Sequence, residues 1–173
     1  PSPYLRQGNE NTTFKRKFIF IHVPKTAGTS ICKALGWQPG HIPASRFLAF
    51  DKKRFHECER IAFCRHPADR LLSAYNYLHS AIGINNSPDV LWAGENLSDY
   101  STFLEFLRAL EDKKHRKTIL SYIHFRPQSD WITIPSETKH CLTWVGRFET
   151  IDADIIRLQS FLSIDLKVDH LRK

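Results

Sequence analysis

The sequence predicts an α/β fold in which helices flank a central parallel β-sheet on both faces. Short apolar runs alternate with amphipathic stretches along the chain, a pattern that favours parallel strands joined by right-handed crossovers. The chain has 173 residues, of which 42% are hydrophobic, enough for one domain with a buried sheet. We expect the polar, basic residues 1–17 to form a flexible N-terminal arm and residues 18–173 to form a single domain.

The strands are predicted from short apolar runs that cannot form a helix on their own. The first run is apolar except for His22, and Pro24 ends it. The predicted strands cover Phe18–Val23, Arg60–Cys64 and Cys141–Val145, with a fourth expected either near His41 or at Ile132–Ile134.

The helices are predicted where apolar residues recur at helical spacing. Pro67 suits the first turn of one of them, where its missing N–H has no partner to lose. The predicted helices cover Thr29–Leu35, Ala68–His79, Ser101–Leu110 and Asp152–Leu162.

The segment Ser80–Leu97 is rich in Asn, Gly and Pro and is expected to be the longest irregular stretch, with Trp92 exposed. We interpret it as a solvated loop, and a lid that contacts a substrate is the alternative.

The segment Lys25–Ser30 has the composition of an anion-binding loop. It combines a cation, hydroxyl side chains and Gly28, whose missing side chain lets the backbone approach a ligand, and a predicted helix follows. Backbone N–H groups at the start of a helix bind phosphate or sulfate. The loop is not a Walker A sequence, because its Lys precedes its Gly. An ordinary strand–turn–helix with a surface lysine is the alternative.

A second candidate anion site follows the strand at Arg60–Cys64. Arg65 stands at the end of this strand, and Ser73 lies on the helix behind it. An arginine fork with a hydroxyl suits a phosphate dianion, and ligands of parallel α/β sheets bind at the carboxyl ends of the strands. A helix start with a solvated arginine is the alternative.

The two segments together resemble the carbohydrate sulfotransferases, which use 3′-phosphoadenosine 5′-phosphosulfate (PAPS). In that family a Lys-before-Gly loop binds the 5′-phosphosulfate, and an R-x-P-x-x-R-x-x-S-x-Y segment binds the 3′-phosphate. The second segment is complete here as Arg65, Pro67, Arg70, Ser73 and Tyr75. His124–Ile132 and Trp144–Ile164 are similar to the C-terminal half of the same enzymes, so the resemblance runs from about Phe18 to Ile164.

The resemblance implies a P-loop-like three-layer fold and a PAPS-dependent sulfotransferase with 3′,5′-ADP as its nucleotide product. The expected acceptor is a carbohydrate hydroxyl, while a lipid-linked glycan, a small alcohol or a peptide tyrosine stays open. The implied cofactor-binding residues are Lys25, Thr26, Ala27, Gly28, Thr29, Ser30, Arg65 and Ser73. The residues expected at the acceptor are His124, Arg126 and Gln128.

Sulfuryl transfer is an in-line displacement, so positioning and electrostatic stabilisation supply most of the catalysis. We expect Lys25 to neutralise the bridging oxygen of PAPS and His41 to take the acceptor proton as the base. His124 is the alternative base, whereas His22 is expected to be buried and hydrogen-bonded within its strand. No spacing of metal ligands appears, and no metal is expected.

Two other functions remain open. A P-loop kinase would need an acidic Mg²⁺ ligand at a strand end, and neither of the first two predicted strands ends in Asp. A non-catalytic module that binds PAPS or phosphate would keep Arg65 and Ser73 without needing Lys25 or a base. The net charge of +7 suits an anionic cofactor, and the lack of a nucleic-acid recognition motif argues against nucleic acid as partner.

The compartment is expected to be the cytoplasm, or the Golgi lumen if the chain belongs to a eukaryotic enzyme. No apolar run approaches the ~20 residues that span a bilayer. Cysteines are expected to be core thiols rather than disulfides, because no C-x-x-C pair occurs among Cys32, Cys58, Cys64 and Cys141.

Overall fold

The computed structural model describes residues 17–38, 40–135 and 137–168. The chain divides into two compact units, one made of the residues up to His66 and from Pro127 onward, and the other of Pro67–Arg126. The expected arm at residues 1–17 lies outside the described residues except for Lys17, and the single domain at residues 18–173 stays a prediction.

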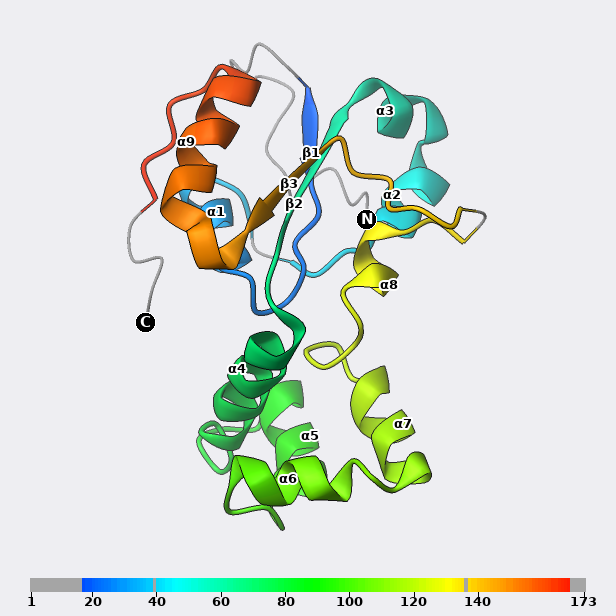
Figure 1. The fold of residues 1–173 in the computed structure, drawn as a ribbon, viewed down its shortest axis with the longest axis vertical. Coiled ribbons are helices and arrows are strands. Elements are labelled where there is room, and N and C mark those ends of the chain that lie inside the picture. The colour runs from blue at the N-terminus through cyan, green and yellow to red at the C-terminus, as the bar shows by residue number, and fades with distance from the viewer. Residues whose placement is uncertain (1–16, 39, 136, 169–173) are drawn as a thin grey trace. The chain divides into compact units, whose positions relative to one another are not determined.

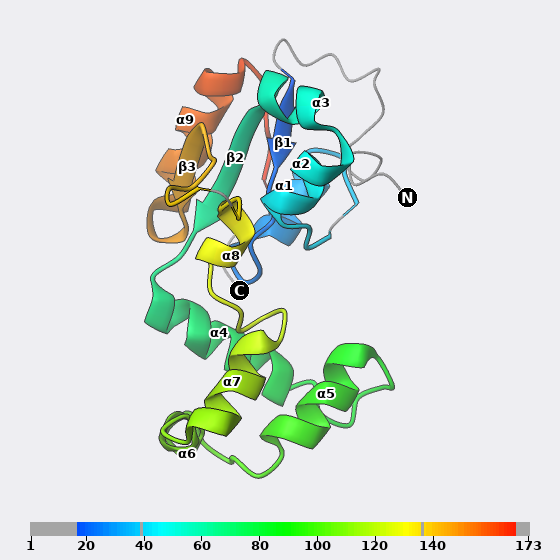
Figure 2. The same cartoon turned by 90° about the vertical axis from the view of Figure 1, so that its right-hand side faces the viewer.

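The first unit contains a parallel sheet with the strand order β1–β2–β3 (Figures 1 and 2). Phe18 of β1 pairs with Glu59 of β2, and Ile61 of β2 pairs with Trp144 of β3. The described part of the chain is therefore a mixed α/β structure with a small parallel sheet that helices flank, as predicted. The strands cover Phe18–Phe20 (β1), Glu59–Cys64 (β2) and Trp144–Arg147 (β3).

All three predicted strands differ from the observed ones at their ends, since β2 begins at Glu59 rather than Arg60 and β3 ends at Arg147 rather than Val145. β1 is shorter than predicted, although the Ile21 N–H still donates to the Ile61 carbonyl at 2.8 Å. β3 begins later than predicted because the Thr143 hydroxyl, rather than a backbone carbonyl, accepts from the Arg60 N–H at 2.8 Å.

The expected fourth strand is wrong for the described residues. The chain near His41 leads into a helix that starts at Ala44, and Ile132 ends another short helix. Thr133 forms only an isolated antiparallel bridge with His140. Pro127 and the polar residues after it favour the first turn of a helix over an extended strand.

Helices cover both faces of this sheet, as Figure 1 shows. Phe18, Phe20, Ile61 and Phe63 pack with α1 and α9 in one apolar cluster. Ile19 and Ile21 are fully buried and alternate with them, so they point to the opposite face, where α2 and α3 lie. The helical elements of this unit are α1 (Gly28–Ala34), α2 (Ala44–Phe50), α3 (Lys52–Glu57), α8 (Ser129–Ile132), the 3₁₀ turn η2 (Phe148–Thr150) and α9 (Ile151–Leu162).

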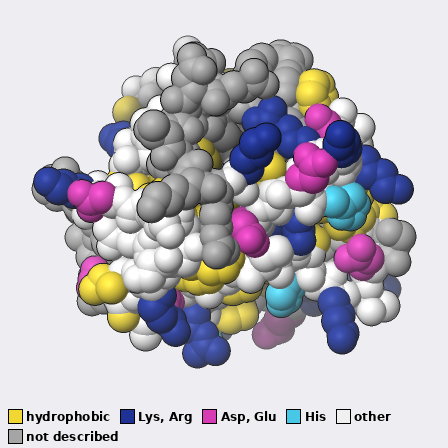
Figure 3. All heavy atoms as spheres, turned by 90° about the horizontal axis from the view of Figure 1, so that it is seen from above, with side chains coloured by type: hydrophobic (Ala, Val, Ile, Leu, Met, Phe, Trp, Pro, Cys, Tyr) yellow, Lys and Arg dark blue, Asp and Glu magenta, His cyan; other side chains and the backbone are white. Residues whose placement is uncertain are grey.

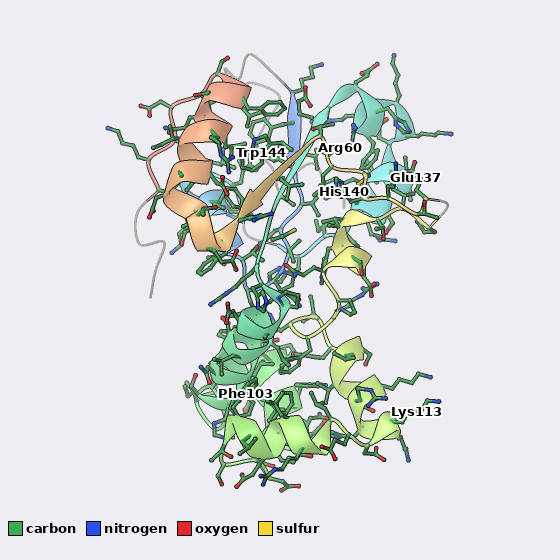
Figure 4. All side chains as sticks on the ribbon, viewed as in Figure 1. Arg60, Phe103, Lys113, Glu137, His140 and Trp144 are labelled. Atoms are coloured by element: carbon green, nitrogen blue, oxygen red, sulfur yellow. The ribbon has the colours of Figure 1, made fainter. Side chains whose placement is uncertain are left out.

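The start of β2 is held by Arg60, which Figure 4 labels beside Trp144 of β3. Arg60 Nε donates to the Cys141 carbonyl at 2.7 Å. Its Nη1 donates to the carbonyls of Phe55 and Cys58 at 3.0 and 2.8 Å. One guanidinium therefore joins the end of α3 to the segment that enters β3.

The second unit is helical, and its helices enclose a core of their own. Ala74 and Leu78 of α4 pack with Ala93 and Leu97 of α5 and with Phe106 of α6. Thr102 and Glu105 form a reciprocal capping box at the start of α6. The helices cover Pro67–His79 (α4), Pro88–Leu97 (α5), Phe103–Ala109 (α6) and Lys113–Ser121 (α7).

The prediction of an irregular stretch at Ser80–Leu97 is wrong in its second half. Pro88 opens α5 at the first helical position, where a missing N–H costs nothing. Trp92 is not an exposed loop residue, because its ring stacks on Tyr122 with a centroid distance of 3.7 Å and an interplanar angle of 7°. The prediction of thiols is confirmed at all four cysteines, and burial raises the pKa of the Cys32 thiol to about 12.

The surface carries charges of both signs. On the face that Figure 3 shows, Lys and Arg side chains lie at several places with Asp and Glu between them, so the net charge of +7 does not form one basic patch there. In the described ranges, no helix has the length and apolar character needed to cross a membrane.

Candidate active site

The predicted anion loop follows β1 and has an unusual backbone. Lys25 and Ala27 both have positive φ values, of 68° and 65°, although neither is glycine. Thr26 between them is fully buried, and its hydroxyl donates to the Val23 carbonyl at 2.8 Å. Non-glycine residues in this region are strained, and such strain persists where the surrounding structure fixes it. The loop is therefore held in shape by the protein.

Gly28 begins α1 and lies directly against the ring of His22. His22 is buried at 4% exposure, as predicted, but it lies after the end of β1 rather than within the strand. Its ring also stacks on Phe20 with a centroid distance of 6.0 Å. His22, which lies between β1 and the loop, thus supports the loop from inside the unit.

His41 lies beside His22 and is partly buried. The two ring centroids are 4.2 Å apart, and His41 Nδ1 lies 3.3 Å from the His22 carbonyl oxygen. A carbonyl can only accept, so this contact requires a proton on Nδ1 and leaves the lone pair on Nε2. The buried Trp131 ring lies edge-on to His41 with a centroid distance of 6.0 Å.

Arg65 stands just past the end of β2 and reaches the anion loop. Its Nη1 donates to the Lys25 carbonyl at 3.5 Å, and its guanidinium lies 4.1 Å from the centroid of the Phe148 ring. Arg65 Nε is buried and has no hydrogen-bond partner among the described residues. A buried donor without a partner is one that a bound anion can satisfy. The first unit therefore brings Lys25 and Arg65 together, as an anion site requires.

Side chains from two distant segments hold the backbone around Arg65. Gln128 Oε1 accepts from the Arg65 N–H at 2.9 Å, and Gln128 Nε2 donates to the Arg65 carbonyl at 2.8 Å. Glu149 Oε1 accepts from the His66 N–H at 2.6 Å. Burial alone would raise the pKa of Glu149, but this hydrogen bond and the nearby Arg65 charge outweigh it and hold the pKa below its ordinary value.

In the second unit, Arg70 and Tyr75, which belong to the segment predicted to bind phosphate, make structural contacts. Arg70 is buried and donates to the carbonyls of His124 and Arg126 at 3.1 and 2.8 Å. The Tyr75 hydroxyl donates to the Tyr100 carbonyl at 2.9 Å. Ser73 belongs to this unit and Arg65 to the other, so their pairing at one phosphate stays a prediction.

The sequence reasoning missed a polar cluster around Asp89 at the start of α5. Its carboxylate accepts from Tyr122 at 2.5 Å and from Tyr77 at 3.1 Å, and lies 3.1 Å from His124 Nε2. Burial alone would raise the pKa of Asp89, but these contacts outweigh it and hold the pKa below its ordinary value. The partners lie 12 to 35 residues from Asp89, so no local pattern reveals them.

The remaining residues predicted to bind the cofactor or the acceptor lie at the start of α1 and just before Pro127. Thr29 is exposed and Ser30 partly buried at the start of α1. Arg126 is partly buried, and its carbonyl accepts from Arg70. In the described part of the chain, no group of three or more His, Cys, Asp and Glu residues is arranged to hold a metal ion.

The parallel sheet, the strained loop after β1 and the arginine after β2 together give an α/β protein with a candidate anion-binding site. A family model described as the sulfotransferase family matches residues 11–172, and the chain belongs to that family. The protein is therefore an enzyme, a transferase that moves a sulfuryl group. The family uses PAPS as its general donor and a hydroxyl-bearing acceptor. No curated protein and no solved structure matches the chain.

Proposed function

We propose that this sulfotransferase transfers the sulfuryl group of PAPS to a carbohydrate hydroxyl, with Lys25 and His41 as its catalytic residues. We also propose that β1, the loop and α1 form the P-loop-like core of the fold. The observation that carries the proposal is the contact between the Arg65 guanidinium and the Lys25 carbonyl. It joins the two segments that the sequence assigns to the two ends of the same nucleotide.

The loop fits the 5′ end of the donor. Positive φ values at Lys25 and Ala27 turn successive backbone units in alternating directions, which favours N–H groups that converge on an anion. Lys25 is partly buried, and charge on a developing oxygen is stabilised more strongly in such a site than in water. We assign Lys25 to the oxygen that bridges phosphorus and sulfur, and Arg65 to the 3′-phosphate.

The contact of His41 with the His22 carbonyl supports its role as base. Because Nδ1 carries the proton, Nε2 can accept the proton of the acceptor hydroxyl. In the proposed step the acceptor oxygen forms a bond to sulfur while the bond from sulfur to the bridging oxygen breaks. The proton moves to His41 Nε2, and the electron pair of the broken bond stays on the 5′-phosphate of 3′,5′-ADP.

The binding experiment compares 3′,5′-ADP, 5′-AMP and ATP with Mg²⁺ by thermal unfolding. We expect 3′,5′-ADP to raise Tm most, because a ligand at ~100 times its Kd stabilises the native state by about 2.7 kcal/mol. An equal rise in Tm with 5′-AMP would show that the protein has no site for the 3′-phosphate. A larger rise in Tm with ATP and Mg²⁺ would favour a kinase. Transfer from labelled PAPS to glycans, small alcohols and tyrosine peptides then identifies the acceptor class.

A further inference from the structure

The side chain of Gln128 forms two hydrogen bonds with the backbone of Arg65, a contact that would not be required if Gln128 only bound a ligand. Its amide meets both backbone groups of one residue, accepting from the N–H at 2.9 Å and donating to the carbonyl at 2.8 Å. The last pair of β2 with β3 is Cys64 with Arg147, so Arg65 is the first residue beyond the paired strand. The amide of Gln128 therefore supplies the kind of two-point contact that a neighbouring strand would make.

The backbone that carries the Gln128 side chain is held in a fixed position. The Gln128 carbonyl accepts from the Trp131 N–H at 3.0 Å in the first turn of α8. Trp131 is one of the largest fully buried side chains of the protein. Pro127 restricts the backbone just before Gln128. A side chain on a backbone that is fixed in this way can hold its hydrogen-bond partner at a defined position.

The fixed backbone in turn determines where the Arg65 guanidinium lies. Its face is against Phe148, and one edge reaches the Lys25 carbonyl. The adjacent His66 N–H is held by Glu149, so the backbone on both sides of the Arg65 carbonyl is fixed. An arginine held in this way loses less conformational freedom when it binds a phosphate.

We propose that Gln128 is a positioning residue that tunes recognition of the donor's 3′-phosphate through Arg65, rather than a contact of the acceptor. The inference rests on the proposed function, because it takes Arg65 as the partner of the 3′-phosphate. It assigns to Gln128 the preference for nucleotides with a 3′-phosphate over those without one.

The experiment measures Kd for 3′,5′-ADP and for 5′-AMP by calorimetry in the full chain. In Gln128→Ala we expect affinity for 3′,5′-ADP to fall about tenfold, the scale of one or two net hydrogen bonds, while affinity for 5′-AMP stays unchanged. Gln159→Ala is the matched control, because Gln159 bonds to Asp165 and Leu166 elsewhere in the same unit. A merely structural effect would weaken both nucleotides alike.

Gln128→Glu provides a second readout. At neutral pH its carboxylate can accept from the Arg65 N–H but repels the Arg65 carbonyl, whereas the protonated acid can donate to that carbonyl as the amide does. The 3′,5′-ADP affinity of this variant, relative to the native protein at the same pH, should therefore recover as pH falls from 7.5 toward the ordinary glutamate pKa of about 4.3. Gln128→Ala should show no recovery.

The outcomes separate the two proposals. If the native protein does not prefer 3′,5′-ADP over 5′-AMP, the proposed function is wrong and the inference falls with it. If the native protein has this preference and Gln128→Ala keeps it, the role of Gln128 alone is wrong. If Gln128→Ala raises KM for the acceptor and leaves nucleotide affinity unchanged, the positioning role is also wrong, and Gln128 contacts the acceptor instead.

Discussion

The imidazole of His22 occupies the space that a side chain at position 28 would need. A β-carbon added to Gly28 would lie 1.9 Å from His22 Cδ2 and 2.3 Å from His22 Nε2. Contacts this short do not occur between non-bonded atoms, so either the ring or the loop would have to move. Gly28 is therefore required by its neighbour, although its own φ is not positive.

Gly28→Ala should destabilise the protein by about 1–3 kcal/mol, the usual cost of overpacking a filled interior. The measurement is urea unfolding, repeated in a His22→Ala background. In that background, Gly28→Ala should lower the free energy of unfolding much less, or even raise it, because alanine is a better helix former than glycine by up to ~1 kcal/mol. Equal costs in the two backgrounds would show that the ring contact does not matter.

Lys25→Ala should lower kcat by roughly 10²–10³, the scale for losing one preorganised electrostatic donor. Arg65→Ala should instead raise KM for PAPS, because its assigned contact is with a group that does not react. Lys33→Ala, on the exposed surface of α1, is the charge-matched control. Normal turnover in Lys25→Ala would reject the catalytic role of this lysine.

His41→Ala should lose roughly 10²–10⁴-fold in turnover while binding 3′,5′-ADP normally. The acidic limb of the pH–rate profile should disappear with it. His124→Ala should keep both, because the His124 ring faces Asp89 in the polar cluster. The opposite pattern, with His124→Ala inactive and His41→Ala unaffected, would transfer the base to His124.

The Asp89 cluster should make stability depend on pH in the acid range. The pKa of Asp89 is lowered from 3.8, so its contribution is complete above about pH 3.8 and is lost as pH falls through the lower folded value. Asp89→Asn should cost about 1–3 kcal/mol at pH 7 and progressively less in acid. Urea unfolding followed by tryptophan fluorescence measures this difference, since Trp92 stacks on Tyr122, a partner of Asp89.

Asp99→Asn is the control, because Asp99 is exposed in the same unit. Parallel pH profiles for the native protein and Asp89→Asn would contradict the assigned contribution of Asp89.

The sheet and the helices that follow its first two strands could be predicted because their signals are local. Buried strands such as Arg60–Cys64 are continuous apolar runs, and Pro67 marks a helix start directly. By contrast, α5 was missed because Pro88 and Gly94 are typical of loops. Burial of Ala93 and Leu97 against neighbouring helices outweighs that local preference.

The site was predictable at the level of segments, but not of contacts. The order of the Lys25 and Arg65 segments predicted two anion sites for one nucleotide, and the structure brings the Arg65 guanidinium to the Lys25 carbonyl. The two bonds from Gln128 to Arg65 join residues 63 positions apart, and no periodicity reports such a pair. The same limit applies to Asp89, whose partners come from α4 and from the segment after α7. Tertiary hydrogen bonds of this kind become visible only when the fold is known.

The contact between Arg65 and Gln128 also joins the two points where the chain leaves and re-enters the sheet-bearing unit. Pro67–Arg126 begins and ends within two residues of this contact, so its ends are tied together whatever lies between them. Because its two ends lie close together, this segment can be replaced by another one without changing the fold of the sheet-bearing unit. Exchanging residues 67–126 between enzymes of this family should therefore leave the parallel sheet and the Lys25 loop folded.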